Sequence, residues 1–181
     1  MSILLKSVYA LNILCFLALS MLYFNRRGIE LDLRWQALKV LSLLYWAYSL
    51  INLFKNDFTS HFLQIGFAGL NFLSLSILIW TFRTTKGIQF NNIFVTKPPE
   101  HICTTGSYRW VRHPYYLSYL MCYFSTLTIN TSVYNFGGLL ILSVLYLLAI
   151  KSEEQLIMKS DASGTYQAYS MRTKRIIPFI F

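Results

Sequence analysis

The residues best suited to chemistry lie in two polar stretches that flank a pair of apolar runs. The first stretch, residues 103–116, places Arg112 and His113 directly before Pro114, a favourable first residue of a helix. Free N–H groups and the dipole at a helix N-terminus favour an anion, so this pair predicts a site for a carboxylate or phosphate. Gly106, a few residues earlier, permits a turn or a close backbone approach.

The second stretch follows the last apolar run and begins with Glu153 and Glu154. Acidic side chains at the C-terminal end of a helix oppose its dipole, which argues against a merely solvated helix end. Further on, Tyr166, Tyr169 and Arg172 fall three residues apart and would line one side of a short helix. Two more bases, Lys174 and Arg175, precede Ile176-Ile177-Pro178.

A hairpin of two helices would bring both stretches to the same membrane face. Anion-binding groups (Arg112, His113) and cation-binding groups (Glu153, Glu154) would then flank one pocket, which suits a zwitterionic ligand with hydroxyls. The alternative is structural: Trp, Tyr and Arg are ordinary residues of a membrane boundary, and a basic amphipathic helix can lie on lipid headgroups.

The composition identifies the elements that must position these groups. Only 23 of 181 residues are charged, while 55% are hydrophobic and 17% aromatic. A chain of this size cannot bury so much apolar surface within itself, which excludes an ordinary soluble domain. The net charge of +9 comes from short basic stretches between apolar runs. This pattern indicates the membrane surface, and no nucleic acid partner is expected.

Five apolar runs are near the length that a bilayer requires: residues 4–24, 36–54, 62–82, 114–133 and 136–150. The fifth is short and should continue as a helix through Glu154. The predicted fold is an all-α integral membrane protein with five transmembrane helices and an amphipathic tail that closes a pocket. Residues 1–95 would supply three helices and residues 96–181 the hairpin and tail, in one structural unit. Polar residues within the runs, such as Asn71, Ser74 and Ser118, are expected to serve helix packing.

The basic residues predict the orientation. With five spans, fourteen of the sixteen fall on one side: Arg26, Arg27, Arg34, Lys39, Arg83, Lys86, Lys97, Arg109, Arg112, Lys151, Lys159, Arg172, Lys174 and Arg175. Only Lys6 and Lys55 fall on the other, so the N-terminus is expected outside and the C-terminus in the cytosol. Three scattered cysteines without metal-ligand spacing predict free thiols and no metal site.

Both stretches carry a recognisable pattern. The segment Thr105-Gly106-Ser107-Tyr108-Arg109-Trp110-Val111-Arg112-His113-Pro114-Tyr115-Tyr116 resembles the T-G-x-Y-R-x-x-R-H-P-x-Y motif of the isoprenylcysteine carboxyl methyltransferase and phospholipid methyltransferase superfamily. The double Glu, the Tyr166-x-x-Tyr169 pair and Arg175-Ile176-Ile177-Pro178 resemble the tail of the same superfamily. The likeness covers residues 96–181.

The resemblance implies a membrane enzyme that transfers a methyl group from S-adenosylmethionine, leaving S-adenosylhomocysteine, to a lipid-like or prenylated acceptor that enters sideways between helices. It implies cofactor contacts from two sets of residues: Gly106, Tyr108, Arg112, His113 and Tyr116, and then Glu153, Glu154, Tyr166 and Tyr169. Arg175 and Glu154 are the implied catalytic residues. Arg175 also matches the second set, so it would hold either the cofactor or an anionic acceptor. Aromatic faces would suit the sulfonium cation.

Departures from the pattern bear on the acceptor. The double Glu lies one residue further from Tyr166 than usual, Ser118 replaces the usual Gly, and Lys151 is the nearest base where many members have Arg. An isoprenylcysteine-like carboxylate is the first choice of acceptor, followed by a phospholipid amine or a small thiol. Two other classes stay open: an NADPH-dependent membrane reductase and a non-enzymatic membrane subunit.

Overall fold

The computed structural model describes residues 2–23, 33–56, 60–86 and 102–180 of the chain. Most of the described residues belong to helices: the five helices of a bundle, called the long helices below, and α6, which lies beyond them. Their bounds are α1 (Ser2–Tyr23), α2 (Leu33–Lys55), α3 (His61–Thr85), α4 (Pro114–Ser125), α5 (Val133–Met158) and α6 (Ser163–Arg172). Two 3₁₀ turns, η1 (Gly106–Arg109) and η2 (Thr126–Thr128), precede and follow α4. The predicted boundary between residues 95 and 96, and the bases Arg26, Arg27 and Lys97, lie outside the described residues.

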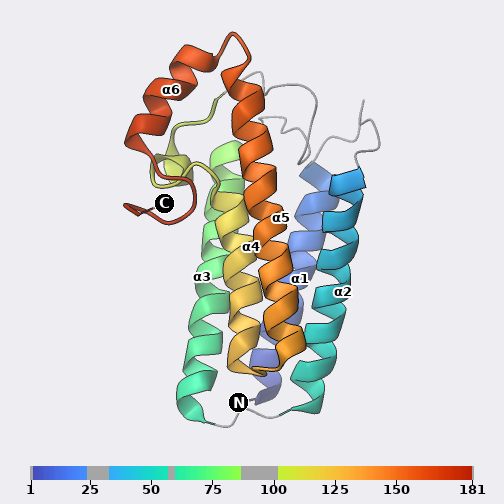
Figure 1. The fold of residues 1–181 in the computed structure, drawn as a ribbon. Coiled ribbons are helices and arrows are strands. Elements are labelled where there is room, and N and C mark those ends of the chain that lie inside the picture. The colour runs from blue at the N-terminus through green and yellow to red at the C-terminus, as the bar shows by residue number, and fades with distance from the viewer. Residues whose placement is uncertain (1, 24–32, 57–59, 87–101, 181) are drawn as a thin grey trace.

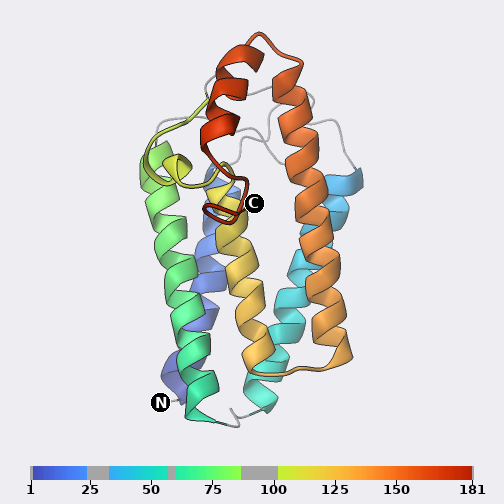
Figure 2. The same ribbon diagram turned by 60° about the vertical axis from the view of Figure 1, so that its left-hand side comes forward.

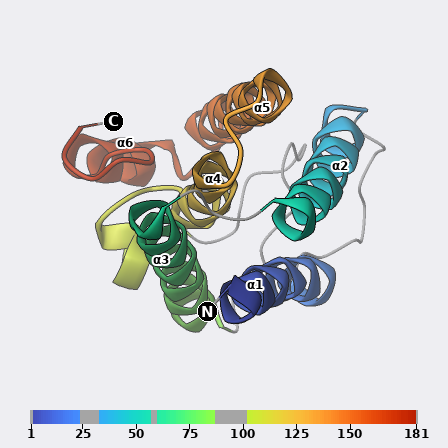
Figure 3. The same ribbon diagram turned by 90° about the horizontal axis from the view of Figure 1, so that it is seen from below.

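The five long helices run up and down in a bundle, so that each is antiparallel to the next along the chain (Figure 1). Seen along the bundle axis, α4 lies between α3 and α5, with α1 and α2 on the opposite side (Figure 3). The start of α1 and the C-terminal segment lie at opposite ends of the bundle (Figures 1 and 2). Five successive antiparallel helices, α1 to α5, produce this arrangement.

Local sequence signals set several helix boundaries. The Ser60 hydroxyl accepts the Leu63 N–H at 3.3 Å at the start of α3, and the Ser132 hydroxyl accepts the Asn135 N–H at 3.3 Å at the start of α5. Such caps satisfy donors that a helix end would otherwise leave unpaired. Pro114 opens α4, as predicted, because a missing N–H costs nothing at the first turn.

Three of the helices are long and apolar enough to cross a membrane: α2 over Gln36–Lys55, α3 over His61–Thr85 and α5 over Val133–Met158. A shorter apolar stretch, Ile3–Ala18, lies within α1. Large apolar side chains such as Leu44, Phe72 and Leu140 remain more than half exposed on the outer surface of the bundle. This apolar exterior is that of a protein that meets lipid.

Aromatic rings and small polar groups fill the interior. Tyr123 of α4 lies 5.7 Å from the Trp46 ring of α2 and 6.2 Å from the Tyr146 ring of α5, measured between centroids. Polar contacts also join the helices. Asn12 donates its amide to the Asn71 oxygen at 3.1 Å, and Ser74 donates to the Ser118 carbonyl at 2.8 Å. The side chains of Asn71 and Ser74 therefore serve helix packing, as the sequence predicts. Ser118 contributes its backbone carbonyl, while its hydroxyl donates to the Tyr115 carbonyl in its own helix.

One helix end differs from the sequence prediction. The fourth run was expected to extend to residue 133, but α4 ends at Ser125 and continues only as η2. Hydroxyls of Ser125 and Thr126 donate to carbonyls three residues earlier, which favours the tighter 3₁₀ turn. The fifth helix does continue past residue 150, as predicted, and reaches Met158. Beyond it α6 folds back over the end of the bundle (Figure 2).

Candidate active site

A tight turn places the Arg-His segment against the end of α3. Gly106 has a φ of 58°, and a Cβ at this position would lie 2.3 Å from the Thr84 hydroxyl oxygen. The glycine thus combines a left-handed conformation with a contact that no other residue could make without a shift. Further along, the Tyr115 hydroxyl lies 2.9 Å from the Thr85 hydroxyl, which fixes the first turn of α4 to α3.

The same segment is held by the chain that follows α6. The Arg112 N–H donates to the Lys174 carbonyl at 2.7 Å, and the His113 N–H donates to the Arg175 carbonyl at 3.0 Å. With Val111 and Lys174 paired in a parallel bridge, two segments distant in sequence run side by side. The backbone itself therefore joins the two polar stretches.

Glu154 is the centre of the polar cluster. Its carboxylate accepts from Arg112 Nε and Arg175 Nε, each at 2.8 Å, and from the Tyr166 hydroxyl at 3.1 Å. His113 Nε2 lies 3.4 Å from the same carboxylate. Only 9% of the Glu154 side chain is exposed, so two guanidinium groups offset the cost of removing its charge from water.

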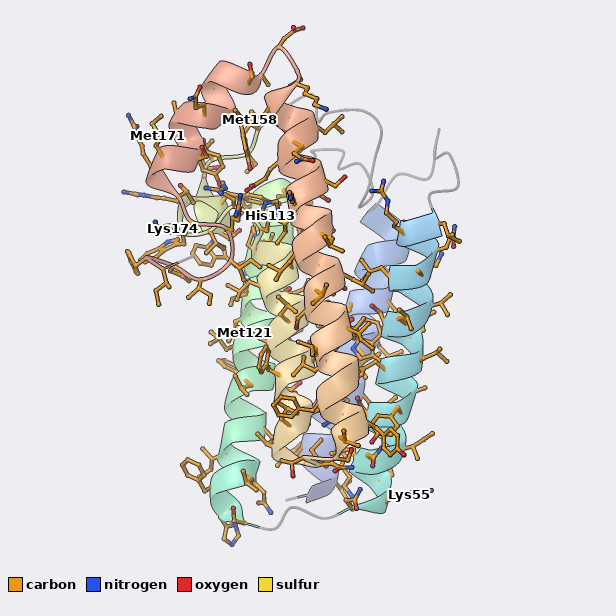
Figure 4. All side chains as sticks on the ribbon, viewed as in Figure 1. Lys55, His113, Met121, Met158, Met171 and Lys174 are labelled. Atoms are coloured by element: carbon orange, nitrogen blue, oxygen red, sulfur yellow. The ribbon has the colours of Figure 1, made fainter. Side chains whose placement is uncertain are left out.

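Glu153 has different surroundings from its neighbour. It accepts a hydrogen bond from the Tyr116 hydroxyl, and one of its oxygens lies 3.7 Å from His113 Nδ1. The His113 and Tyr116 rings are parallel, with centroids 5.5 Å apart. Figure 4 shows His113 between α5 and the C-terminal segment, where it can reach both carboxylates. The side chain of Glu153 is 22% exposed, more than that of Glu154.

Arg112 also holds the end of α6. Its Nη1 donates to the Ser170 carbonyl at 2.9 Å and to the Thr173 carbonyl. A cation at the C-terminal end of a helix satisfies carbonyls that lack helical partners and complements the dipole. Arg112, predicted to bind an anion, thus donates to Glu154 and to two backbone carbonyls of this chain. It links the start of α4 to α5 and to the end of α6.

The two tyrosines of α6 face the site. The Tyr169 hydroxyl donates to the Tyr108 carbonyl at 2.6 Å, and the Tyr166 and Tyr169 rings lie 6.0 Å apart. Burial, followed by the negative charge of Glu154, raises the pKa of Tyr166 above its ordinary value. Burial likewise raises the pKa of Tyr169. Both phenols consequently remain protonated donors at neutral pH.

The structure brings most of the predicted site residues together. The side chains of Arg112, His113, Glu153, Glu154, Tyr116, Tyr166 and Arg175 form one connected cluster. Tyr169 lies beside Tyr166 of this cluster, and its hydroxyl donates to the Tyr108 carbonyl. Gly106 shapes the turn against α3, beside Thr84.

Several contributors carry no sequence signal of their own. Nothing in the sequence marks Thr84, which lies against Gly106. The same holds for the carbonyls of Ser170 and Thr173, which accept from Arg112 only because the fold brings them together. Tyr146 of α5 meets the Tyr116 ring at 5.3 Å, and only its helical register relative to Glu153 could have indicated this. No group of three or more potential metal-binding side chains occurs in the described residues. Cys15, Cys103 and Cys122 are free thiols.

Comparison with known proteins supports one family. The model of the isoprenylcysteine carboxyl methyltransferase (ICMT) family matches residues 67–159, which is 93 of the 181 residues. The match covers most of α3, all of η1, α4 and α5, and both glutamates, whereas α6 and Arg175 follow it. No curated protein and no solved structure matches the chain. The chain belongs to the isoprenylcysteine carboxyl methyltransferase family, and is accordingly a membrane methyltransferase.

Proposed function

We propose that the protein transfers a methyl group from S-adenosylmethionine to the carboxylate of an isoprenylcysteine-like lipid, as an enzyme of the EC 2.1.1 class. The observation that carries the proposal is the pair of adjacent carboxylates, Glu153 and Glu154, held among arginine, histidine and tyrosine side chains at one end of an apolar helical bundle. Family membership supplies the reaction type. The polar cluster supplies groups of both charge signs.

The donor set fits the charges of S-adenosylmethionine. Its ammonium group would pair with Glu153, which has fewer cationic partners here than Glu154. Its carboxylate would pair with a guanidinium, and its sulfonium would lie against aromatic rings. The parallel rings of His113 and Tyr116 offer such faces next to Glu153. When bound, S-adenosylmethionine supplies a methyl group that its sulfonium has already activated for transfer.

The residues of this chain would contribute mainly by alignment. Effective catalysis of such a transfer rests on holding the acceptor oxygen in line and on excluding water. A carboxylate acceptor is already ionised at neutral pH and needs no base. An amine acceptor would have to lose a proton, and His113, which reaches both glutamates, is the group placed to receive it.

Arg175 is the proposed acceptor-orienting residue. Its Nε contacts Glu154, yet 41% of its side chain is exposed, in contrast to 10% for Arg112. A planar guanidinium can bind a carboxylate through two parallel hydrogen bonds, which a lysine cannot do. Glu154 would then position Arg175 and Arg112, in addition to the catalytic role that the family resemblance implies for it.

The membrane arrangement belongs to the same proposal. We place α1 and α4 in the bilayer alongside α2, α3 and α5, because all five pack side by side in one bundle (Figure 3). With the bases distributed fourteen to two, the end that carries Glu154 faces the cytosol and the start of α1 faces outside. The acceptor would reach the cluster from the lipid, between helices.

The decisive experiment is a ligand titration of the purified protein in detergent. S-adenosylmethionine should bind with measurable heat, NADPH should not, and Glu153→Gln should weaken the binding. Binding of NADPH alone would favour a reductase, and binding of neither would favour a non-enzymatic subunit. Methyl transfer would then be compared among a prenylcysteine, a phosphatidylethanolamine and a simple thiol. Transfer only to the amine lipid would replace the carboxylate assignment and leave the methyltransferase.

Arg175→Lys tests the acceptor assignment separately. We expect a slower methyl transfer with little change in S-adenosylmethionine affinity, because a point charge replaces a planar fork near the acceptor. Losing one charged hydrogen bond typically costs about 1.5–3 kcal/mol, or roughly ten- to a hundred-fold in rate. The rate is measured at saturating cofactor, and cofactor affinity by calorimetry. An equal fall in affinity and rate would instead make Arg175 a cofactor ligand.

A further inference from the structure

The segment after α6, residues 173–180, forms an exposed apolar surface outside the helical bundle together with Trp110. Four large side chains make up what we call the apolar tip: Trp110, Ile177, Phe179 and Ile180. Their exposed fractions are 51%, 48%, 81% and 75%. The Trp110 and Phe179 rings meet edge to face at 6.1 Å, so the tip joins the segment before α4 to the segment after α6.

A turn over residues 177–180 sets the direction of the side chains in the tip. The Ile180 N–H donates to the Ile177 carbonyl at 3.2 Å, with Pro178 and Phe179 as the two central residues. Phe179 has a φ of 68°, which is uncommon for a residue other than glycine. Proline followed by a positive φ is the pattern of a type II turn. An uncommon conformation is thus used to direct two bulky apolar side chains outward, where the protein itself gives them little cover.

Bases lie near the tip in sequence. Arg109, Arg172 and Lys174 are all exposed, within five residues of Trp110 or Ile177 along the chain. Met171 and Lys174 project from the outer side of the C-terminal segment, away from the bundle (Figure 4). Exposed aromatic and apolar side chains together with nearby lysine and arginine match an interface whose outer layer is anionic and whose inner layer is hydrocarbon.

The position of the tip along the bundle axis, relative to the ends of α3 and α4, indicates which surroundings the tip meets. The chain after α6 turns back toward the bundle, beside the upper ends of α3 and α4 (Figures 1 and 2). The α3 span ends at Thr85, whose hydroxyl contacts Tyr115 in the first turn of α4. The tip therefore lies beside the end of the apolar helix α3, on the side of α6 that faces the bundle. In a bilayer around α3 this is the level at which headgroups would meet acyl chains.

We infer that the apolar tip inserts into an anionic leaflet of the bilayer and thereby holds the polar cluster closed. The tip is close in sequence to the segment that pairs with the backbone of the polar cluster. Lys174 and Arg175, whose carbonyls accept from the Arg112 and His113 amides, precede the tip by only a few residues. Ile176, which lies between Arg175 and the tip, is buried in the core. Residues 174–180 would thus be held by the core on one side and by lipid on the other.

Insertion can be measured with a fluorescent label. In a Cys15→Ser, Cys103→Ser, Cys122→Ser background, Ile180→Cys carries an environment-sensitive dye in nanodiscs of phosphatidylcholine with or without phosphatidylglycerol. Asp161→Cys, in the turn between α5 and α6 far from the bundle, is the matched control (Figure 1). We expect lipids with a shallow spin label to quench the dye at position 180 and not at 161, more strongly with phosphatidylglycerol. An unquenched dye at position 180 would overturn the inference and indicate a water-exposed or protein-binding surface.

Closure has its own test, which requires no ligand. In nanodiscs, the double variant Phe179→Ser, Ile180→Ser should lose hydrogen-exchange protection at the Arg112 and His113 amides, because the segment that accepts from them is no longer tethered. Phe62→Ser removes an equally exposed apolar side chain, 82% exposed, from the opposite end of α3 and should leave that protection unchanged. Equal protection in the two variants would overturn the link between the tip and the cluster, whatever the protein binds.

Discussion

At the scale of single residues, adjacent glutamates have acquired unequal partners. Glu154 accepts from two arginines and a tyrosine with 9% of its side chain exposed, whereas Glu153 accepts from Tyr116 and lies near His113. A buried charge that loses one partner leaves the others uncompensated. The surroundings therefore predict a structural effect at position 154 and a binding effect at position 153.

Glu154→Gln should destabilise the protein. The substitution removes the negative charge while Arg112 and Arg175 remain, and we expect a loss of about 3 kcal/mol, the lower end of the range for breaking a buried pair, because Arg175 is 41% exposed. Glu153→Gln, which can still accept from Tyr116, should lose much less stability and more S-adenosylmethionine affinity. Chemical unfolding in detergent, followed by calorimetry on the folded fraction, compares the two. A reversed order would contradict the assignment.

The sequence predicts the members of this cluster and leaves their pairing open. Residue type alone indicates that Arg112, His113 and the glutamates can bind a zwitterion. Which glutamate faces the arginines depends on the rotation of α5 about its own axis, and one residue of difference turns a side chain by about 100°. The carbonyls of Ser170 and Thr173 were beyond prediction because every residue carries a carbonyl and only the fold selects which ones meet Arg112.

At the scale of elements, the turn at Gly106 decides how η1 meets α3. Gly106→Ala should destabilise the protein by about 1–3 kcal/mol, the cost of a residue forced into a sparsely populated backbone region. A Cβ would also lie 2.6 Å from the Thr84 methyl carbon. Thermal unfolding measures the loss, and Thr84→Ala in the same chain should restore part of it by removing the clash. Full restoration would mean that the φ of 58° costs nothing.

The docking of α6 depends on phenol hydrogen bonds. Tyr169→Phe removes the bond to the Tyr108 carbonyl and should cost about 0.5–1.5 kcal/mol at neutral pH. Burial raises the pKa of Tyr169 above its ordinary value of 10.0, so its contribution is complete below pH 10 and is lost as the pH rises beyond it. Unfolding free energy measured between neutral and alkaline pH should fall less steeply in Tyr169→Phe than in the parent. Parallel curves would exclude this tyrosine as a source of the alkaline loss.

The elements themselves were largely predictable, apart from the end of α4. Periodic apolar runs indicate α2, α3 and α5 within a few residues, and Tyr166 and Tyr169 share a helix as their spacing predicts. The apolar run at residues 114–133 does not by its hydrophobicity show an early stop, although it contains Ser125 and Thr126, whose hydroxyls favour the 3₁₀ turn. Contacts with other helices also hold this end: the Tyr45 hydroxyl of α2 lies 2.7 Å from the Thr126 hydroxyl and donates to the Asn135 side-chain oxygen at 2.7 Å.

At the scale of the whole molecule, the two termini of the described chain lie at opposite ends of the bundle (Figure 1). Reporter fusions at Met1 and at Phe181 should therefore report opposite compartments, with a cytosolic reporter active only at Phe181. The basic residues predict this direction. The same reporter placed after Asn56, between α2 and α3, is the internal control and should match the Met1 fusion. Activity of an exported reporter at Phe181 would invert the orientation, and agreement between Met1 and Phe181 would contradict five passes.

The pairing of Arg112 with carbonyls 58 and 61 residues further along the chain has a consequence for biosynthesis. Arg175 is synthesised after both α4 and α5, so the Glu154 carboxylate can gain its second arginine only when the segment after α6 has been made. Assembly of the cluster therefore depends on residues that are synthesised after the helices of the bundle. A chain interrupted after Met158 would contain α1 to α5 but neither the Tyr166 nor the Arg175 partner of Glu154.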